Sequence, residues 1–152
     1  MRQPLTRDQF LDLHRTLSNW NRWGAHDQLG ALNLITPEKR VAAARLVRSG
    51  RSVSCARPLP TVPAADNQTP VVHLMTATAT EGYGGDYVAL APHGYSTSHI
   101  DALCHIFHDD RMYNGYPAAR VTARGALELA IDALRDGIVT RGVLLDAAGA
   151  RG

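Results

Sequence analysis

The sequence predicts a mixed α and β fold, because helical patterns alternate with strand-like runs along a chain of 152 residues. Hydrophobic residues make up 45% of the chain, which is enough to bury a core. The chain contains no internal repeat that would indicate a solenoid or an array. We therefore expect one domain spanning residues 1–152.

Three helices are expected from apolar residues that recur at helical spacing. The first lies around residues 10–17. The second begins at Thr36, which can cap it, continues with a first-turn proline at Pro37 and ends at Gly50. The third covers residues 123–135, where leucines, isoleucine and alanines form an apolar stripe.

Strands are expected where β-branched and aliphatic residues cluster, and we expect them to share one sheet. The four candidates are residues 52–56, 71–77, 86–91 and 142–146. Three prolines in residues 58–67 cannot join a ladder, so this segment is predicted to be a long loop. Residues 81–86 are glycine-rich but lack the lysine of a phosphate-binding loop, which favours a simple turn and excludes a nucleotide site of that type.

Charge and hydropathy exclude several classes of partner. The 16 basic and 14 acidic residues are scattered, so we expect no nucleic-acid partner. No stretch reaches the roughly 18 apolar residues of a membrane span, and the N-terminus lacks a secretory signal. We therefore expect a cytoplasmic protein without a membrane partner. Cys55 and Cys104 lack CxxC spacing, so neither a disulfide framework nor a cysteine-rich zinc site is predicted.

The segment of residues 93–105 carries the most informative chemistry. If the backbone is extended, His99 and Asp101 lie on one face; if a helix begins at Asp101, Asp101 and His105 share a face. Either geometry brings imidazole and carboxylate together, and this pair of donors suits zinc or manganese. Spacing of this kind also arises by chance, so by itself it leaves the function open.

The full sequence of this segment, PHGYSTSHIDALCH at residues 92–105, is followed by the motif MYNG at residues 112–115. It closely resembles the cyclase family that includes bacterial kynurenine formamidase and isatin hydrolase. That family's signature is HxGTHxDxPxH, and the resemblance implies that His99 and Asp101 bind metal and that His105 shuttles protons. Tyr95 stands at the position of the signature's first histidine, and a phenol with a pKa near about 10 is a poor zinc ligand.

The resemblance extends over nearly the whole chain, including the motif DQLGALN at residues 27–33 and RGVLLD at residues 141–146. It implies the swivelling β/β/α-type domain of the family. Members of the long branch continue for about as many residues again and draw further metal ligands from that part. The chain therefore resembles an N-terminal half, in which the family fold would be incomplete.

The function implied by the resemblance is metal-dependent hydrolysis of an amide or lactam C–N bond in a small, often aromatic substrate. His105 would protonate the leaving nitrogen. Trp20 and Trp23 are candidates for the substrate pocket together with Tyr95, although packing of the tryptophans against the core is an equally good interpretation. An uncovered edge at the strand predicted for residues 142–146 would readily pair with another chain, so we expect a homo-oligomer. The alternative, motivated by Tyr95 and by the resemblance to an N-terminal half only, is a non-catalytic remnant that binds a metal or a ligand.

Other candidate residues have simpler interpretations. His108, Asp109 and Asp110 are predicted to form a polar turn that faces solvent. Cys104 is interpreted as a buried small hydrophobe rather than a nucleophile. The remaining histidines, His14, His26 and His73, show no informative spacing.

Overall fold

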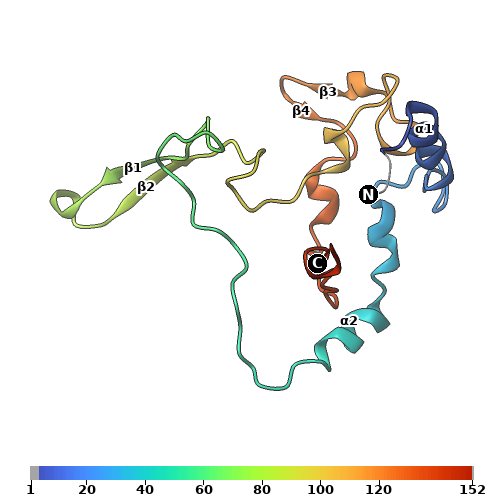
Figure 1. Ribbon diagram of the computed structural model, residues 1–152. Helices are drawn as coiled ribbons and strands as arrows, with labels where there is room; N and C mark the ends of the chain where they lie inside the picture. The colour runs from blue at the N-terminus through green and yellow to red at the C-terminus, as the bar shows by residue number, and fades with distance from the viewer. Residues whose placement is uncertain (1–3, 152) are drawn as a thin grey trace. The chain divides into compact units, whose positions relative to one another are not determined.

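The computed structural model describes residues 4–151 and divides the chain into two compact units. The first unit comprises the chain up to Gly50 and from Ala102 onward, and the second unit is Arg51–Asp101. The described residues mix α and β structure, as predicted: they form two α-helices and two antiparallel two-stranded sheets (Figure 1). Short 3₁₀ turns connect them: η1 (Gly30–Leu34), η2 (Ala79–Glu81), η3 (Leu103–His105), η4 (Tyr113–Gly115), η5 (Ala118–Arg120), η6 (Ile131–Leu134) and η7 (Gly149–Arg151).

Helix α1 (Arg7–Thr16) confirms the first predicted helix. Its N-terminus is a capping box: the Gln9 N–H donates to Thr6 Oγ1 at 3.2 Å, and the Thr6 N–H donates to Gln9 Oε1 at 2.9 Å. These two bonds satisfy amide donors that no helical carbonyl can reach.

Helix α2 (Pro37–Ala44) confirms the predicted start but ends earlier than the expected Gly50. The Lys39 N–H donates to Thr36 Oγ1 at 3.3 Å, so Thr36 is the cap. Beyond Ala44 the amides of residues 46 and 47 bond three residues back, which unwinds the helix into tighter turns. No residue of α2 is buried, so tertiary packing does little to extend it.

The core of the first unit is a small cluster of buried side chains. Met112 and Leu129 are each only 1% exposed, and Ala102 and Cys104 pack with them. The Cys104 N–H donates to the Leu129 carbonyl at 3.2 Å, which joins η3 to this core. Burial raises the pKa of the Cys104 thiol, as expected for a buried small hydrophobe.

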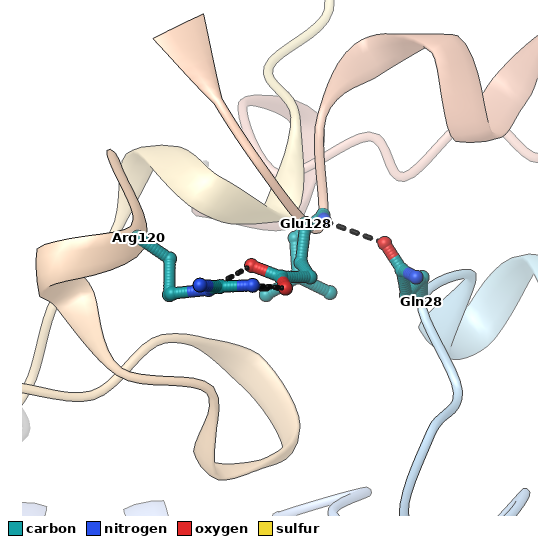
Figure 2. A network of polar contacts seen from close by, with 4 residues as sticks. Gln28, Arg120 and Glu128 are labelled. Atoms are coloured by element: carbon teal, nitrogen blue, oxygen red, sulfur yellow. Dashed lines mark hydrogen bonds and ion pairs between the residues drawn. The ribbon is translucent and has the colours of Figure 1, made fainter. Parts of the chain in front are cut away.

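The predicted third helix, residues 123–135, is wrong. The segment instead contains β4 (Gly125–Ala126), which pairs with β3 (Val121–Thr122), and then the short turn η6. Leu129 has a φ of +60°, which no α-helix can contain, and its N–H donates to Gln28 Oε1 at 2.7 Å (Figure 2). A contact distant in sequence thus overrides the helical apolar pattern.

The carboxylate of Asp27 organises the N-terminal half of the first unit. It accepts hydrogen bonds from the Gly30 N–H at 2.9 Å, from Asn33 Nδ2 at 2.7 Å and from the Tyr113 hydroxyl at 2.9 Å. Burial raises the pKa of Asp27, but these bonds outweigh it and hold the pKa below its ordinary value. Burial and the bond to Asp27 together raise the pKa of Tyr113 to about 12.

In the second unit, β1 (Val72–Ala77) and β2 (Gly85–Ala89) form an antiparallel hairpin (Figure 1). Two of the four predicted strands and the predicted glycine-rich turn are therefore confirmed. The turn begins with η2, whose cap Thr78 pairs with Glu81, and continues through Gly82 at a φ of +79°. Only glycine adopts this conformation without steric cost.

The other two predicted strands, residues 52–56 and 142–146, are wrong, and so is the single sheet. Neither segment has a ladder partner among the described residues, and a β-branched run without a partner cannot satisfy its backbone groups. The loop predicted at residues 58–67 is confirmed: Asn67 Nδ2 donates to the Val62 carbonyl at 2.7 Å and closes it. No helix among the described residues is long and apolar enough to cross a membrane.

Candidate metal site

Two histidine side chains of the second unit approach one carboxylate oxygen, Asp101 Oδ1. The Nδ1 atom of His93 lies 2.8 Å from Asp101 Oδ1, and the Nε2 atom of His99 lies 3.6 Å from the same oxygen. The two imidazole rings meet edge to face, with their centroids 5.5 Å apart. Two imidazoles therefore lie beside one carboxylate oxygen.

The orientation of His99 is fixed by the backbone. Its Nδ1 lies 2.8 Å from the carbonyl oxygen of Thr97, a buried residue, and a carbonyl can only accept a hydrogen bond. Nδ1 must therefore carry the proton, and in the neutral ring Nε2 presents a lone pair toward Asp101. Histidines that bind metals usually donate their other ring N–H to a carbonyl or carboxylate in this way.

The donor set fits a divalent cation. In the neutral ring, the His99 Nε2 lone pair cannot donate to the Asp101 carboxylate, and the 3.6 Å separation of these two acceptors then suits ligands around a shared cation better than a hydrogen bond. Ligand atoms of His93 and Asp101 lie within 4.8 Å of each other. The side chain of His99 is 20% exposed, compared with 55% for His93 and 49% for Asp101, so one side of the group is open to solvent.

The structure places the predicted residues in two different units. His99 and Asp101 lie together in the second unit, on backbone without regular secondary structure. Of the two geometries left open by the sequence, the helix beginning at Asp101 does not form: η3 begins at Leu103 and its cap is Ala102, which offers no side-chain bond. The Asp101 carboxylate faces His93 and His99 instead. His105 is the last residue of η3, four positions after Asp101 in the chain.

Tyr95 lies in the same loop, but its side chain is 89% exposed. Arg57 holds the loop: its Nη1 donates to the Tyr95 carbonyl at 2.9 Å, and its N–H donates to Ser98 Oγ at 3.1 Å. Tyr95 and His93 both line a cavity of about 310 Å³, which also reaches the buried Asn67. This cavity gives a small molecule room beside His93.

Trp20 and Trp23 belong to the first unit. The guanidinium of Arg22 lies over the ring of Trp23, with Cζ 4.9 Å from the ring centroid, a cation–π contact. Trp20 is 37% exposed and lies against the backbone of Gly115.

Sequence reasoning missed His93 as a partner of Asp101. The regular periods of helix and strand connect Asp101 only with His99 and His105, because both assume a chain that runs straight on. Between His93 and Asp101 the chain changes direction, beginning at Gly94 with a φ of +132°. The histidine immediately before a glycine was the one signal of such a reversal.

Comparisons with known proteins bear on the family of the chain. Neither a family model nor a curated protein matches the chain. A crystal structure described as that of a novel cyclase matches 91% of this chain with 32% sequence identity and a TM-score of 0.80. The chain spans about half of that protein, 51% of its length. In sequence and in fold, the chain is thus similar to a cyclase.

Proposed function

We propose that this chain belongs to the cyclase family and that His93, His99 and Asp101 hold a divalent metal, zinc or manganese. The observation that carries the proposal is the bond from His99 Nδ1 to the Thr97 carbonyl, which turns the Nε2 lone pair toward the carboxylate. The similarity to a structure described as a cyclase supports the family assignment. The fold that the family implies is the swivelling β/β/α-type domain, and the expectation of one domain over residues 1–152 remains part of this proposal.

The reaction we propose is hydrolysis of an amide or lactam C–N bond in a small, often aromatic substrate. A bound zinc or manganese would supply an activated water and polarise the carbonyl that is attacked. The substrate would enter from the solvent-exposed side of His93 and Asp101, beside the cavity that reaches Asn67.

His105 is proposed to hold and deliver the proton that the leaving nitrogen needs. It follows Asp101 by four residues, so the chain keeps it within reach of a substrate bound there. An imidazole suits this role because its ordinary pKa lies near neutral pH.

Two measurements test the proposal. Calorimetric titration with zinc and with manganese should show binding that His99→Ala weakens at least about tenfold, whereas His26→Ala, an exposed histidine of the first unit, leaves it unchanged. Hydrolysis of formylkynurenine or isatin should require the metal and should be lost in His105→Ala while the metal stays bound.

The outcomes separate the alternatives. Metal binding without any hydrolysis would favour the non-catalytic metal-binding protein. A metal affinity that falls with His105→Ala would make His105 a ligand instead of a proton carrier. Absence of metal binding would refute the proposed site.

A further inference from the structure

We propose that a second cavity, in the first unit, binds a small aromatic carboxylate. The cavity lies between α1 and the turn of residues 108–111 and has a volume of about 570 Å³, within the range of small-molecule sites. It contains none of the residues proposed to hold the metal, so this inference stands apart from the proposed hydrolase function.

The charge of the cavity is predominantly positive. Arg7 and Arg15 of α1 and Arg111 of the turn all line it. No described residue accepts a hydrogen bond from the guanidinium of Arg7 or Arg15. The one carboxylate in the lining, Asp109, is 88% exposed and lies 3.5 Å from His108 Nε2, so it faces solvent. The cavity therefore offers guanidinium donors to an anion.

One wall of the cavity is a fixed aromatic and cationic surface. Arg111 Nη1 donates to the Gly115 carbonyl at 3.1 Å. A Cβ at Gly115 would lie 3.6 Å from the Trp20 ring and 3.9 Å from Arg111 Nη1, and the φ there is +83°. The absence of a side chain at Gly115 thus lets the indole and the guanidinium approach the same backbone atoms. Trp20 and Arg111 are held next to each other.

The turn that carries Arg111 is itself strained. Asp109 and Asp110 have φ angles of +48° and +56°, which L-residues adopt only at a cost. Reciprocal backbone bonds between His108 and Arg111, 2.8 and 3.0 Å long, hold the turn closed. The polar turn predicted from the sequence therefore forms, but His108 packs against His14, with ring centroids 4.7 Å apart, instead of only facing water.

These features select an aromatic carboxylate among small anions. The planar guanidinium group binds a carboxylate through two parallel hydrogen bonds. The ring of Trp20 and the half-buried Leu11 provide an apolar surface for a flat ring. An inorganic anion would contact only the arginines, and a neutral aromatic molecule would contact only Trp20, so each would make fewer of the available contacts.

The experiment is an NMR titration of the ¹⁵N-labelled chain with benzoate, benzyl alcohol and acetate. Benzoate should shift the NMR signal of the Trp20 indole N–H. It should bind on the order of tenfold more tightly than benzyl alcohol, which has only the ring, or acetate, which has only the carboxylate. Arg15→Gln should weaken benzoate binding by about the same factor. Arg124→Gln, which removes an exposed arginine between β3 and β4, should leave it unchanged.

Arg15 is exposed on a helix that buries no residue, so Arg15→Gln should fold like the parent chain, as circular dichroism can verify. Equal affinities for benzoate and benzyl alcohol would overturn the proposal, because the arginines would then contribute nothing. Equal effects of Arg15→Gln and Arg124→Gln, or shifts that avoid Trp20, would also overturn it.

Discussion

A nearby backbone carbonyl orients the imidazole of His99 as a metal ligand requires. The Thr97 carbonyl, two residues earlier, accepts the Nδ1 proton and directs Nε2 toward Asp101. Because the contact is local, it forms whenever residues 97–101 adopt this loop conformation. His93 depends on the reversal at Gly94 to reach the same carboxylate.

We expect His93→Ala to weaken zinc or manganese binding at least about tenfold, because it removes one nitrogen of a small donor set. The matched variant is Tyr95→His. The family resemblance aligns Tyr95 with the signature's first histidine, so a histidine there is expected to tighten binding. Calorimetry on both variants shows which residue occupies the first ligand position. Tighter metal binding by Tyr95→His would assign that position to Tyr95. An unchanged affinity in Tyr95→His, together with weaker binding in His93→Ala, would assign it to His93.

Asp27 should make the first unit sensitive to acid. Its folded-state pKa is held below the ordinary value of an aspartate, so its stabilisation is fully present above that ordinary value and is lost as the pH falls through the lower folded value. Asp27→Asn should cost about 1–3 kcal/mol at neutral pH, because amide hydrogens would face the donors of Gly30 or Tyr113. The variant should also lose less stability on acidification.

Urea unfolding followed by tryptophan fluorescence measures this effect, because Trp20 and Trp23 both belong to the first unit. Asp136→Asn, at an exposed position of the same unit, is the control. An Asp27→Asn variant with unchanged stability and an unchanged pH profile would contradict the role of these hydrogen bonds.

The secondary-structure elements that were predicted correctly are those stabilised by contacts between residues close together in the chain. The starts of α1 and α2 depend on caps within three residues, and the β1–β2 hairpin depends on a short turn. These elements are confirmed. The segment of residues 123–135 is held by contacts about a hundred residues away, and its helical pattern gave a wrong prediction.

The Gln28 side chain should therefore be critical for the chain around β4. Gln28→Ala would leave the N–H of the buried Leu129 without its acceptor, which costs about 1–3 kcal/mol. The neighbouring pair of Arg120 and Glu128 is more exposed and should matter less (Figure 2). The measurement is the same urea unfolding, with Gln68→Ala in the second unit as control. A loss no greater than in Gln68→Ala would show that this bond is dispensable.

Across the whole molecule, the first unit is built from the two ends of the described chain, and the second unit is the sequence between them. Large apolar side chains remain exposed in both, including Leu144 at 92% and Leu145 at 83% in the first unit and Leu74 at 56% in the second. Apolar surface of this extent marks an interaction site or an association liability.

We expect the chain to self-associate, in line with the homo-oligomer predicted from its sequence. Leu144→Lys should shift the equilibrium toward smaller species, because it places a charge in the most exposed part of the apolar run at residues 143–145. Sedimentation velocity over a range of concentrations measures this, and Leu46→Lys, at an exposed leucine just after α2, is the matched control. Identical sedimentation of parent and Leu144→Lys would exclude residues 143–145 as the contact.

The sequence by itself determined the mixed α and β class, the presence of α1, the start of α2 and the β1–β2 hairpin, and it brought imidazole and carboxylate together at His99 and Asp101. All of these depend on residues close together in the chain, where caps, turns and backbone periods act directly. Only the tertiary structure decided that residues 123–135 are not a helix and that His93 joins Asp101. It also showed that His14 and Trp20 lie beside the turn of residues 108–111. Such contacts join backbone that reverses direction or lies far apart in sequence, and no local period encodes them.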